Sequence, residues 1–268
     1  MRRVAYIDCQ RKLKQKDFMS AQKKQAALIV FLEDTNRDMI HNRLTDDLTR
    51  VEKNNLYRAF LEDTMYTCLS MNNVAVMVNY PSEVAREIVE EAIENLKHKL
   101  TPKKRKFIDS DDFVAVSSKG ESQGERLRNA FGRAFRCDYS PVLLIGCVTP
   151  TLSKSVLQNA VRQLNKYDVV FGPTLEGSYY LIGLSSHERD LYAKIDWDDI
   201  NTALYSQMVS VAEDESLKWN ELDLWYDLRQ PEDFEFLVRD INFFRQVGDE
   251  KSASSTEEVL DEILKKIS

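Results

Sequence analysis

The sequence has few of the residues on which metal, disulfide and membrane proteins depend. Its four cysteines have no Cys-x-x-Cys spacing, which is typical of neither a zinc knuckle nor a disulfide framework, and its three histidines lie far apart. No segment approaches the roughly 20 apolar residues of a membrane span, and the basic N-terminus lacks the apolar core of a signal peptide. These absences predict a cytoplasmic protein with no transmembrane segment.

Common nucleotide and hydrolase motifs are also missing. The chain has no Gly-x-Gly-x-x-Gly, no Walker loop and no Gly-x-Ser-x-Gly, which removes the usual support for a dinucleotide oxidoreductase, a P-loop ATPase or a serine hydrolase. A net charge of -7 argues against a general nucleic-acid surface, because binding to phosphate backbones needs a net basic face. We therefore expect no nucleic-acid partner.

What the chain does contain is an alternation of apolar runs and helical patterns over 268 residues, which predicts an α/β protein with a mainly parallel sheet. We expect a basic extension (1–25), one α/β domain (26–247), and a linker with an amphipathic helix (248–268). The extension is either solvated or an arm that docks on an acidic partner or a membrane surface. The last helix packs in cis or joins an oligomer interface.

Local signals add detail. Ser82 and Ser153 are expected to begin helices, and the basic run 103–106 is expected to form a surface loop. Ser255 and Glu258 have the spacing of a capping box for the last helix.

Residues 141–184 are the most informative part of the chain. They read as strand, loop, helix, strand, loop and strand, with the loops CVTPTL and GPTLEGS following apolar strands. In an open α/β sheet, ligands bind beyond the carboxyl ends of the strands. The pattern therefore predicts that both loops lie at one edge and contribute to a binding site.

Several segments carry a family resemblance. LLIGCVTPTL stands where the family has LLIGSDSPDL, GPTLEGSYYLIGL stands for GPAEDGGYYLIGL, and YDLRQPEDF stands for a segment like YDVDTPEDL. With AALIVF, LYRAFLEDT and GERLRNAF, these segments resemble the bacterial glycosyltransferase-like family of GT-A fold that is associated with radical-SAM/selenodomain and arsenosugar-biosynthesis proteins. The resemblance implies a three-layer GT-A-like (nucleotide-diphospho-sugar transferase) fold with a mainly parallel central sheet.

Two departures from the family pattern concern the metal site that the resemblance implies. Val148 occupies the position of an expected acid, and Arg229 occupies a second acidic position. A hard divalent cation prefers oxygen ligands, which valine lacks, and arginine repels a cation. We expect no metal cofactor, although weak binding of Mg²⁺ or Mn²⁺ by the remaining acids stays open.

The resemblance and the loop positions together suggest site residues. Glu176 and Asp227 are the candidate catalytic acids, although Glu176 also fits a solvated loop acid. Asp227 and Arg229 are two apart in an expected strand and so point to one face, where Arg229 either grips a diphosphate or pairs with nearby acids. The candidate nucleotide- or sugar-binding residues are Glu33, Asp34, Arg43, Gly146, Thr149, Gly172, Gly177, Tyr179 and Arg229.

These features favour a nucleotide-sugar transferase-like protein that has lost metal-dependent catalysis and retains nucleotide or sugar binding, acting alone or through a protein partner. One alternative is an active, metal-independent glycosyl- or nucleotidyltransferase that uses Arg229 and Arg43 in place of the cation. Another is a structural or assembly subunit, such as a homo-oligomer, with a collapsed pocket.

Overall fold

The computed structural model describes residues 25–32, 48–186, 191–192, 194–197, 203–228 and 232–267. Its centre is a seven-stranded sheet with the order β3-β2-β1-β4-β6-β5-β7. The strands are β1 (Ala26–Phe31), β2 (Val74–Tyr80), β3 (Phe113–Ser117), β4 (Val142–Ile145), β5 (Val169–Pro173), β6 (Tyr179–Leu184) and β7 (Trp219–Glu221). Only β6 runs antiparallel to its neighbours, which confirms the α/β fold with a mostly parallel sheet.

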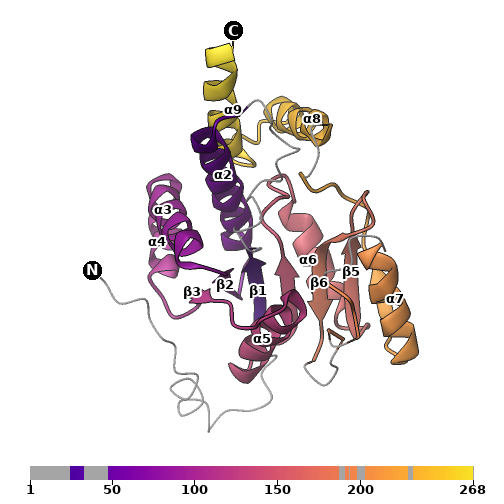
Figure 1. Cartoon of the computed structure of the whole chain (residues 1–268). Coiled ribbons are helices and arrows are strands. Elements are labelled where there is room, and N and C mark those ends of the chain that lie inside the picture. The colour runs from indigo at the N-terminus through magenta and orange to yellow at the C-terminus, as the bar shows by residue number, and fades with distance from the viewer. Residues whose placement is uncertain are drawn as a thin grey trace.

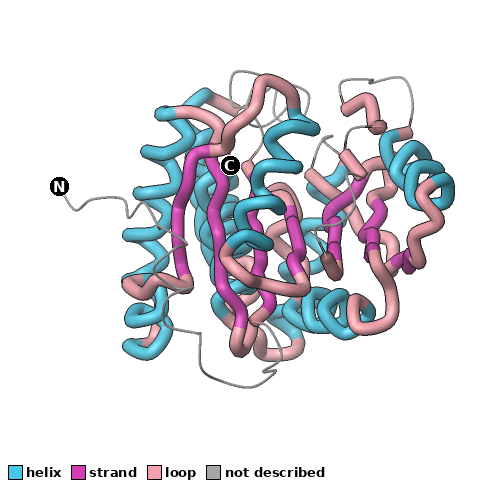
Figure 2. Tube along the Cα trace, turned by 90° about the horizontal axis from the view of Figure 1, so that it is seen from below, coloured by secondary structure: helices cyan, strands magenta, loops and turns pink. Residues whose placement is uncertain are grey.

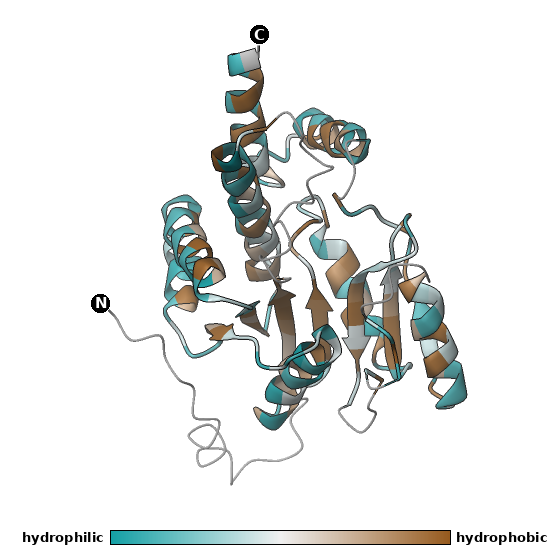
Figure 3. Cartoon of the chain, in the orientation of Figure 1, coloured by the Kyte–Doolittle hydropathy of each residue, from teal (hydrophilic) through white to brown (hydrophobic). Residues whose placement is uncertain are grey.

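Helices cover both faces of this sheet (Figures 1 and 2). They are α2 (Arg50–Leu69), α3 (Glu83–Lys99), α4 (Pro102–Ile108), α5 (Gln123–Arg136), α6 (Lys154–Gln163), α7 (Leu204–Asp214), α8 (Asp233–Gln246) and α9 (Ser254–Ile267). Alternate residues of the strands enter two apolar cores, one shared with α2, α3, α6 and α8 and one shared with α5 and α7. Figure 3 shows the strands as the most hydrophobic elements of the molecule, which is typical of strands buried on both faces.

The expected helix starts have mixed outcomes. Ser82 is the N-cap of α3 and accepts from the amide of Ala85, as expected, and α6 begins directly after Ser153. The run 103–106 was expected to be a loop but lies in α4, which begins with Pro102 at a position where a missing amide hydrogen costs nothing.

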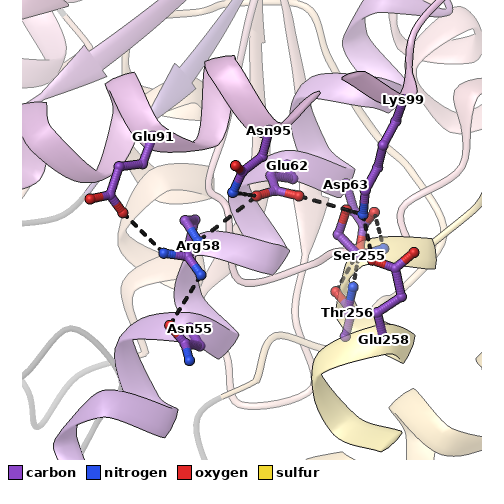
Figure 4. Close-up of polar contacts among 10 residues, drawn as sticks. All are labelled: Asn55, Arg58, Glu62, Asp63, Glu91, Asn95, Lys99, Ser255, Thr256 and Glu258. Carbon is purple, nitrogen blue, oxygen red and sulfur yellow. Dashed lines mark hydrogen bonds and ion pairs between the residues drawn. The ribbon is translucent and has the colours of Figure 1, made fainter. Parts of the chain in front are cut away.

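The capping box expected from Ser255 and Glu258 is wrong, because tertiary contacts use both side chains. The Lys99 ammonium on α3 donates to Ser255 Oγ at 2.9 Å and to a Glu258 carboxylate oxygen at 2.7 Å. The first turn of α9 is capped instead by Asp63 of α2 (Figure 4). The Asp63 carboxylate accepts from the Ser255 and Thr256 amides at 3.0 and 2.8 Å, and from the Thr256 hydroxyl at 2.6 Å.

These contacts dock α9 along α2 of the same chain, and Lys266 near the other end of α9 bonds to Glu52. A carboxylate at a helix N-terminus is also favoured by the helix dipole. None of the described helices is long and apolar enough to cross a membrane. Residues 1–24 lie outside the described part of the chain, and the division into extension, domain and C-terminal segment stays a prediction.

The cysteines differ from the expectation based on their spacing. Cys68 and Cys147 are buried and outside any disulfide, whereas Cys137, which follows α5, is disulfide-bonded. The absence of Cys-x-x-Cys spacing did not predict this bond, because a disulfide depends on distances in space and not on sequence spacing.

Candidate functional site

The two loops that the sequence singled out lie at one edge of the sheet. β4 and β5 both run antiparallel to β6, which lies between them, so β4 and β5 point the same way and their carboxyl ends share an edge. The loop after β4 contains Val148 and Thr149, and the turn after β5 contains Glu176. The prediction that both loops lie at one edge of the sheet is confirmed.

The turn after β5 is held by its own backbone. Thr174 accepts from the Gly177 amide through its carbonyl oxygen and from the Ser178 amide through Oγ1, both at 3.1 Å. Gly177 has a φ of 76°, a left-handed conformation that favours glycine. This tight turn places Glu176 at an exposed tip.

Gly172 has a different reason to be glycine. A Cβ atom at this position would lie 2.4 Å from the ring of Tyr180, whose hydroxyl donates to the Asp223 carbonyl at 3.0 Å. The absence of a side chain at Gly172 thus leaves room for the Tyr180 ring. Gly146, by contrast, has nothing within 4 Å of its ideal Cβ position, so crowding does not explain it.

A third segment, 222–228, links the two loops. The Trp225 amide donates to the Pro173 carbonyl at 3.1 Å, and the Leu228 amide donates to the Val148 carbonyl at 3.0 Å. Asp227 lies between these bonds. The expected strand around Asp227 is wrong, because only an isolated bridge from Thr174 to Trp225 forms there, and β7 ends earlier at Glu221.

The structure brings the two candidate catalytic acids together. The side chains of Glu176 and Asp227, which come from separate loops, are hydrogen-bonded to each other. Partial burial raises the pKa of Glu176 to about 7, and the hydrogen bond and negative charge of Asp227 act in the same direction, with a smaller contribution from Asp233. Two carboxylates cannot bond without a proton, and the raised pKa of Glu176 lets its carboxyl group carry that proton in part of the molecules at neutral pH.

Two buried polar atoms belong to the loop after β4 and to the segment 222–228. Thr149 is 2% exposed, and its hydroxyl has no hydrogen-bond partner among the described residues. The indole nitrogen of Trp225 is likewise buried without a partner in the described part of the chain. Buried polar groups are normally hydrogen-bonded, so two such groups in adjacent loops need an explanation.

The Val148 side chain offers no oxygen at the position where the family resemblance implies an acid. Across the described ranges, no group of three or more His, Cys, Asp or Glu residues is arranged to hold a metal ion.

A chain of hydroxyl and carboxyl groups beneath the site was not predicted. Thr151 Oγ1 and Tyr226 Oη lie 2.6 Å apart, and Tyr226 Oη donates to Asp240 on α8 at 2.9 Å. Burial raises the pKa of Tyr226. These bonds tie the loop after β4 to the segment 222–228 and to α8. Tyr226 belongs to the segment YDLRQPEDF, which the sequence analysis singled out, but the sequence did not indicate that Thr151 and Asp240 bond to it.

Tyr179 begins β6 at the same edge and is half-buried. Its ring meets Trp197 edge-on at 6.0 Å between centroids. The binding role expected of Tyr179 stays a prediction, as do those of Gly146, Thr149, Gly172 and Gly177. Four further candidates, Glu33, Asp34, Arg43 and Arg229, lie outside the described residues.

Comparisons with known proteins agree with this architecture. The model of the family DUF2064, described as "Uncharacterized protein conserved in bacteria", matches residues 64–199, just over half of the chain. No curated protein matches the sequence.

Two solved structures share the fold. A candidate nucleotide-diphospho-sugar transferase from Desulfovibrio desulfuricans G20 aligns with a TM-score of 0.69 and 22% identity, over 90% of this chain and 95% of that chain. The 4-diphosphocytidyl-2C-methyl-D-erythritol synthase from Anaerococcus prevotii DSM 20548 aligns with a TM-score of 0.51 and 12% identity, over 82% and 96%. At these identities the likeness establishes the fold alone.

Proposed function

This chain belongs to the DUF2064 family, and we propose that it binds a nucleotide or a nucleotide sugar at the carboxyl edge of its sheet without metal-dependent catalysis. The likeness to a candidate nucleotide-diphospho-sugar transferase and to a 4-diphosphocytidyl-2C-methyl-D-erythritol synthase supports the ligand class by analogy of fold. The finer resemblance to the radical-SAM/selenodomain-associated, arsenosugar-type transferases is part of the same proposal, as is a cytoplasmic location.

The pairing of Glu176 with Asp227 is the observation that carries the proposal. A carboxylic acid bonded to a carboxylate keeps several acceptor lone pairs side by side, which match the donating hydroxyl groups of a ribose or another sugar. A divalent cation, by contrast, needs both groups deprotonated and finds no oxygen on the Val148 side chain. The pair therefore favours a hydroxyl-bearing ligand over a metal ion.

The two unpartnered polar atoms support a ligand at the same place. The Thr149 hydroxyl and the Trp225 indole nitrogen are both buried in segments that backbone hydrogen bonds join at this edge, and each would gain a hydrogen bond from a bound polar molecule. Arg229 follows Asp227 by two residues, and in this proposal its guanidinium contacts a diphosphate in place of a metal.

A thermal-shift screen of nucleotides and nucleotide sugars, with Mn²⁺ or with EDTA, tests the proposal. A ligand that binds only the native state stabilises it by about 2.7 kcal/mol at a hundredfold excess over Kd. We expect at least one ligand to raise the melting temperature equally in Mn²⁺ and in EDTA. The shift should shrink in Glu176→Ala and Asp227→Ala, and it should persist in Glu213→Ala, an exposed acid on α7.

Other outcomes would contradict the proposal in distinct ways. A shift that needs Mn²⁺ and is lost in EDTA indicates a metal-dependent site. Turnover of the bound nucleotide sugar in EDTA supports the metal-independent transferase, and its loss in Arg229→Ala would identify the residue that replaces the cation. No shift with any ligand supports the assembly subunit with a collapsed pocket.

A further inference from the structure

Tyr226 is the middle member of a chain of hydrogen bonds that joins three separate segments. Its hydroxyl donates to Asp240 on α8 at 2.9 Å and lies 2.6 Å from the hydroxyl of Thr151 in the loop after β4. A phenol has one proton, so a Tyr226 hydroxyl that donates to Asp240 accepts from Thr151. The chain therefore runs in one direction, from Thr151 through Tyr226 to Asp240.

Both ends of this chain are fixed. Asp240 uses its second carboxylate oxygen to accept from the Arg239 guanidinium, at 3.1 Å from Nε and 2.9 Å from Nη2. Thr151, at the other end, is only 2% exposed, so bulk water does not reach its side chain. In a buried polar chain of this kind, the loss of one member leaves its neighbours unsatisfied.

The ring of Tyr226 is held as well as its hydroxyl. It stacks on Trp225 with 6.0 Å between centroids and 12° between planes, and it packs on Phe236 of α8 at 5.5 Å. The Arg239 guanidinium in turn covers the Phe236 ring at 5.3 Å. Two ring contacts and two hydrogen bonds thus restrict the Tyr226 side chain to one placement.

The hydroxyl chain is one of two connections between the loop after β4 and the segment 222–228. In the first, the Tyr226 side chain meets the Thr151 side chain. In the second, the Leu228 amide donates to the Val148 carbonyl at 3.0 Å. Asp227 lies between Tyr226 and Leu228, so the segment is tied to the loop on both sides of this acid.

The loop after β4 is tied on both sides of Thr149 in the same way. Thr149 lies between Val148 and Thr151, which make the two connections. The loop also closes on itself, because the Leu152 amide donates to the Thr149 carbonyl at 3.0 Å. A displacement of Thr151 therefore displaces Thr149, whose buried hydroxyl has no partner within the described ranges.

We propose that Tyr226 is a positioning residue of the candidate site, whose hydroxyl holds the loop that contains Thr149 in place against the segment that contains Asp227. This inference rests on the proposed function, because it gives Tyr226 a role in binding the same ligand. Tyr226 acts through the two segments and makes no contact with the ligand. A site whose parts are already in place loses less conformational freedom on binding, so the hydroxyl raises affinity indirectly.

The chain offers a matched control at the opposite edge of the sheet. Tyr139, which is 5% exposed, donates from its hydroxyl to Asp112 at 3.3 Å. These residues precede β4 and β3, and the strands β3, β2, β1 and β4 pair in parallel. This tyrosine–aspartate bond therefore lies at the amino ends of the strands, whereas the site loops follow carboxyl ends. Tyr139→Phe removes the same kind of bond away from the site.

Hydrogen–deuterium exchange of the ligand-free protein tests whether the hydroxyl holds the loop. Tyr226→Phe keeps the ring, and we expect peptides that contain the Leu152 and Leu228 amides to exchange about tenfold faster than in the wild type. Thr151→Val should have the same effect. Thr151→Ser, which keeps a hydroxyl, and Tyr139→Phe should exchange as the wild type does. Unchanged exchange in Tyr226→Phe would overturn the proposal.

Calorimetry in EDTA tests the role in binding, with uridine diphosphate glucose and cytidine triphosphate as the probes. We expect a probe that binds the wild type to bind Tyr226→Phe about fivefold to tenfold more weakly, and Tyr139→Phe within about twofold of the wild type. The double variant Tyr226→Phe/Thr151→Val should bind no more weakly than Tyr226→Phe, because both changes remove the same connection.

The outcomes separate this inference from the proposed function. Equal affinity in the wild type and Tyr226→Phe, or equal losses in Tyr226→Phe and Tyr139→Phe, would leave Tyr226 a structural residue and the proposed function intact. Additive losses in the double variant would contradict the shared connection. If the wild type binds neither probe nor any other ligand of the screen, the proposed function is refuted and the positioning role with it.

Discussion

Asp63 and Glu176 lie in different parts of the molecule, yet the pKa of each is raised to about 7, and burial is the leading cause for both. Their partners differ. Asp63 is buried in α2 and accepts three hydrogen bonds from the first turn of α9 (Figure 4). Glu176 lies at an exposed turn and bonds to another acid, Asp227. A raised pKa by itself therefore does not distinguish a binding site from a structural contact.

The partners explain the difference in role. Donors from α9 bond to both oxygens of Asp63, so this carboxyl group holds α2 and α9 together. Glu176 bonds to Asp227, so the pair keeps acceptor capacity for a ligand, and the linked segments also contain buried polar atoms without a partner among the described residues. Four measurements test whether the two acids differ in this way.

Removing the Asp63 carboxyl group should have the largest effect. Asp63→Ala leaves the Ser255 and Thr256 amides and the Thr256 hydroxyl without their acceptor in a buried place, which should lower the free energy of unfolding by about 3 kcal/mol. Urea unfolding followed by circular dichroism measures the loss. Glu258→Ala, which removes an exposed ion pair with Lys99, should cost under about 1 kcal/mol. Similar losses in the two variants would contradict a structural role specific to Asp63.

The pH dependence of stability should follow Asp63 next. Its pKa is about 7 in the native state and near 3.8 when unperturbed, so the native state binds more protons between these values. The free energy of unfolding should therefore fall as pH rises from about 4 to 7, by at most about 1.4 kcal/mol per pH unit for this group. Asp63→Asn should flatten that slope more than Glu176→Gln, because solvent screens the exposed Glu176. Stability that rises over this pH window, or equal flattening by both variants, would refute the expectation.

A single donor to Asp63 should matter less. Thr256→Val removes the hydroxyl that donates to Asp63 at 2.6 Å and should lower the free energy of unfolding by about 1 kcal/mol. Ser252→Ala removes a hydroxyl that donates at the same 2.6 Å to Asp249 in an exposed place, and should change stability by less. Urea unfolding of both variants tests whether burial makes the difference, and a larger loss in Ser252→Ala would argue against it.

Glu176 should affect ligand binding rather than stability. If the proton on Glu176 holds the pair with Asp227 in its ligand-binding arrangement, affinity should fall by about threefold to tenfold between pH 6 and pH 8, with solvent screening reducing the effect. Glu176→Gln keeps a donor at every pH, so its affinity should stay constant. Calorimetry with the best ligand of the screen measures both, and Glu213→Gln should behave as the wild type does. A pH profile of Glu176→Gln that parallels the wild type would exclude this role for the proton.

Much of the fold could be predicted because its signals are local. Apolar runs such as AALIVF and VAVMVNY have the composition of strands buried on both faces, and Ser82 sits directly before a helical pattern. The expected capping box at the last helix failed because of a contact from a distant part of the chain. Ser255 and Glu258 have the spacing of a capping box, but Lys99, over 150 residues away, forms stronger charge-assisted bonds with both.

The candidate site could be predicted in part. The resemblance of two sequence segments to the transferase family indicated Glu176 and Asp227 separately. Nothing in either segment indicated that the two acids share a hydrogen bond. The chain of Thr151, Tyr226 and Asp240 was not predicted for the same reason, since its members come from three segments. The expected strand at Asp227 failed because 222–228 pairs with the two site loops through scattered backbone bonds.

Patterns in the sequence were enough to predict most of the strands and helices and the edge at which the site loops lie, because periodicity and turn residues act over a few neighbouring positions. Contacts made in the folded chain settled that Asp63 caps a helix and that Glu176 bonds to Asp227. Burial and charge set a pKa through neighbours in space, and Asp63 meets α9 across 192 residues, while Glu176 meets an acid from a separate segment.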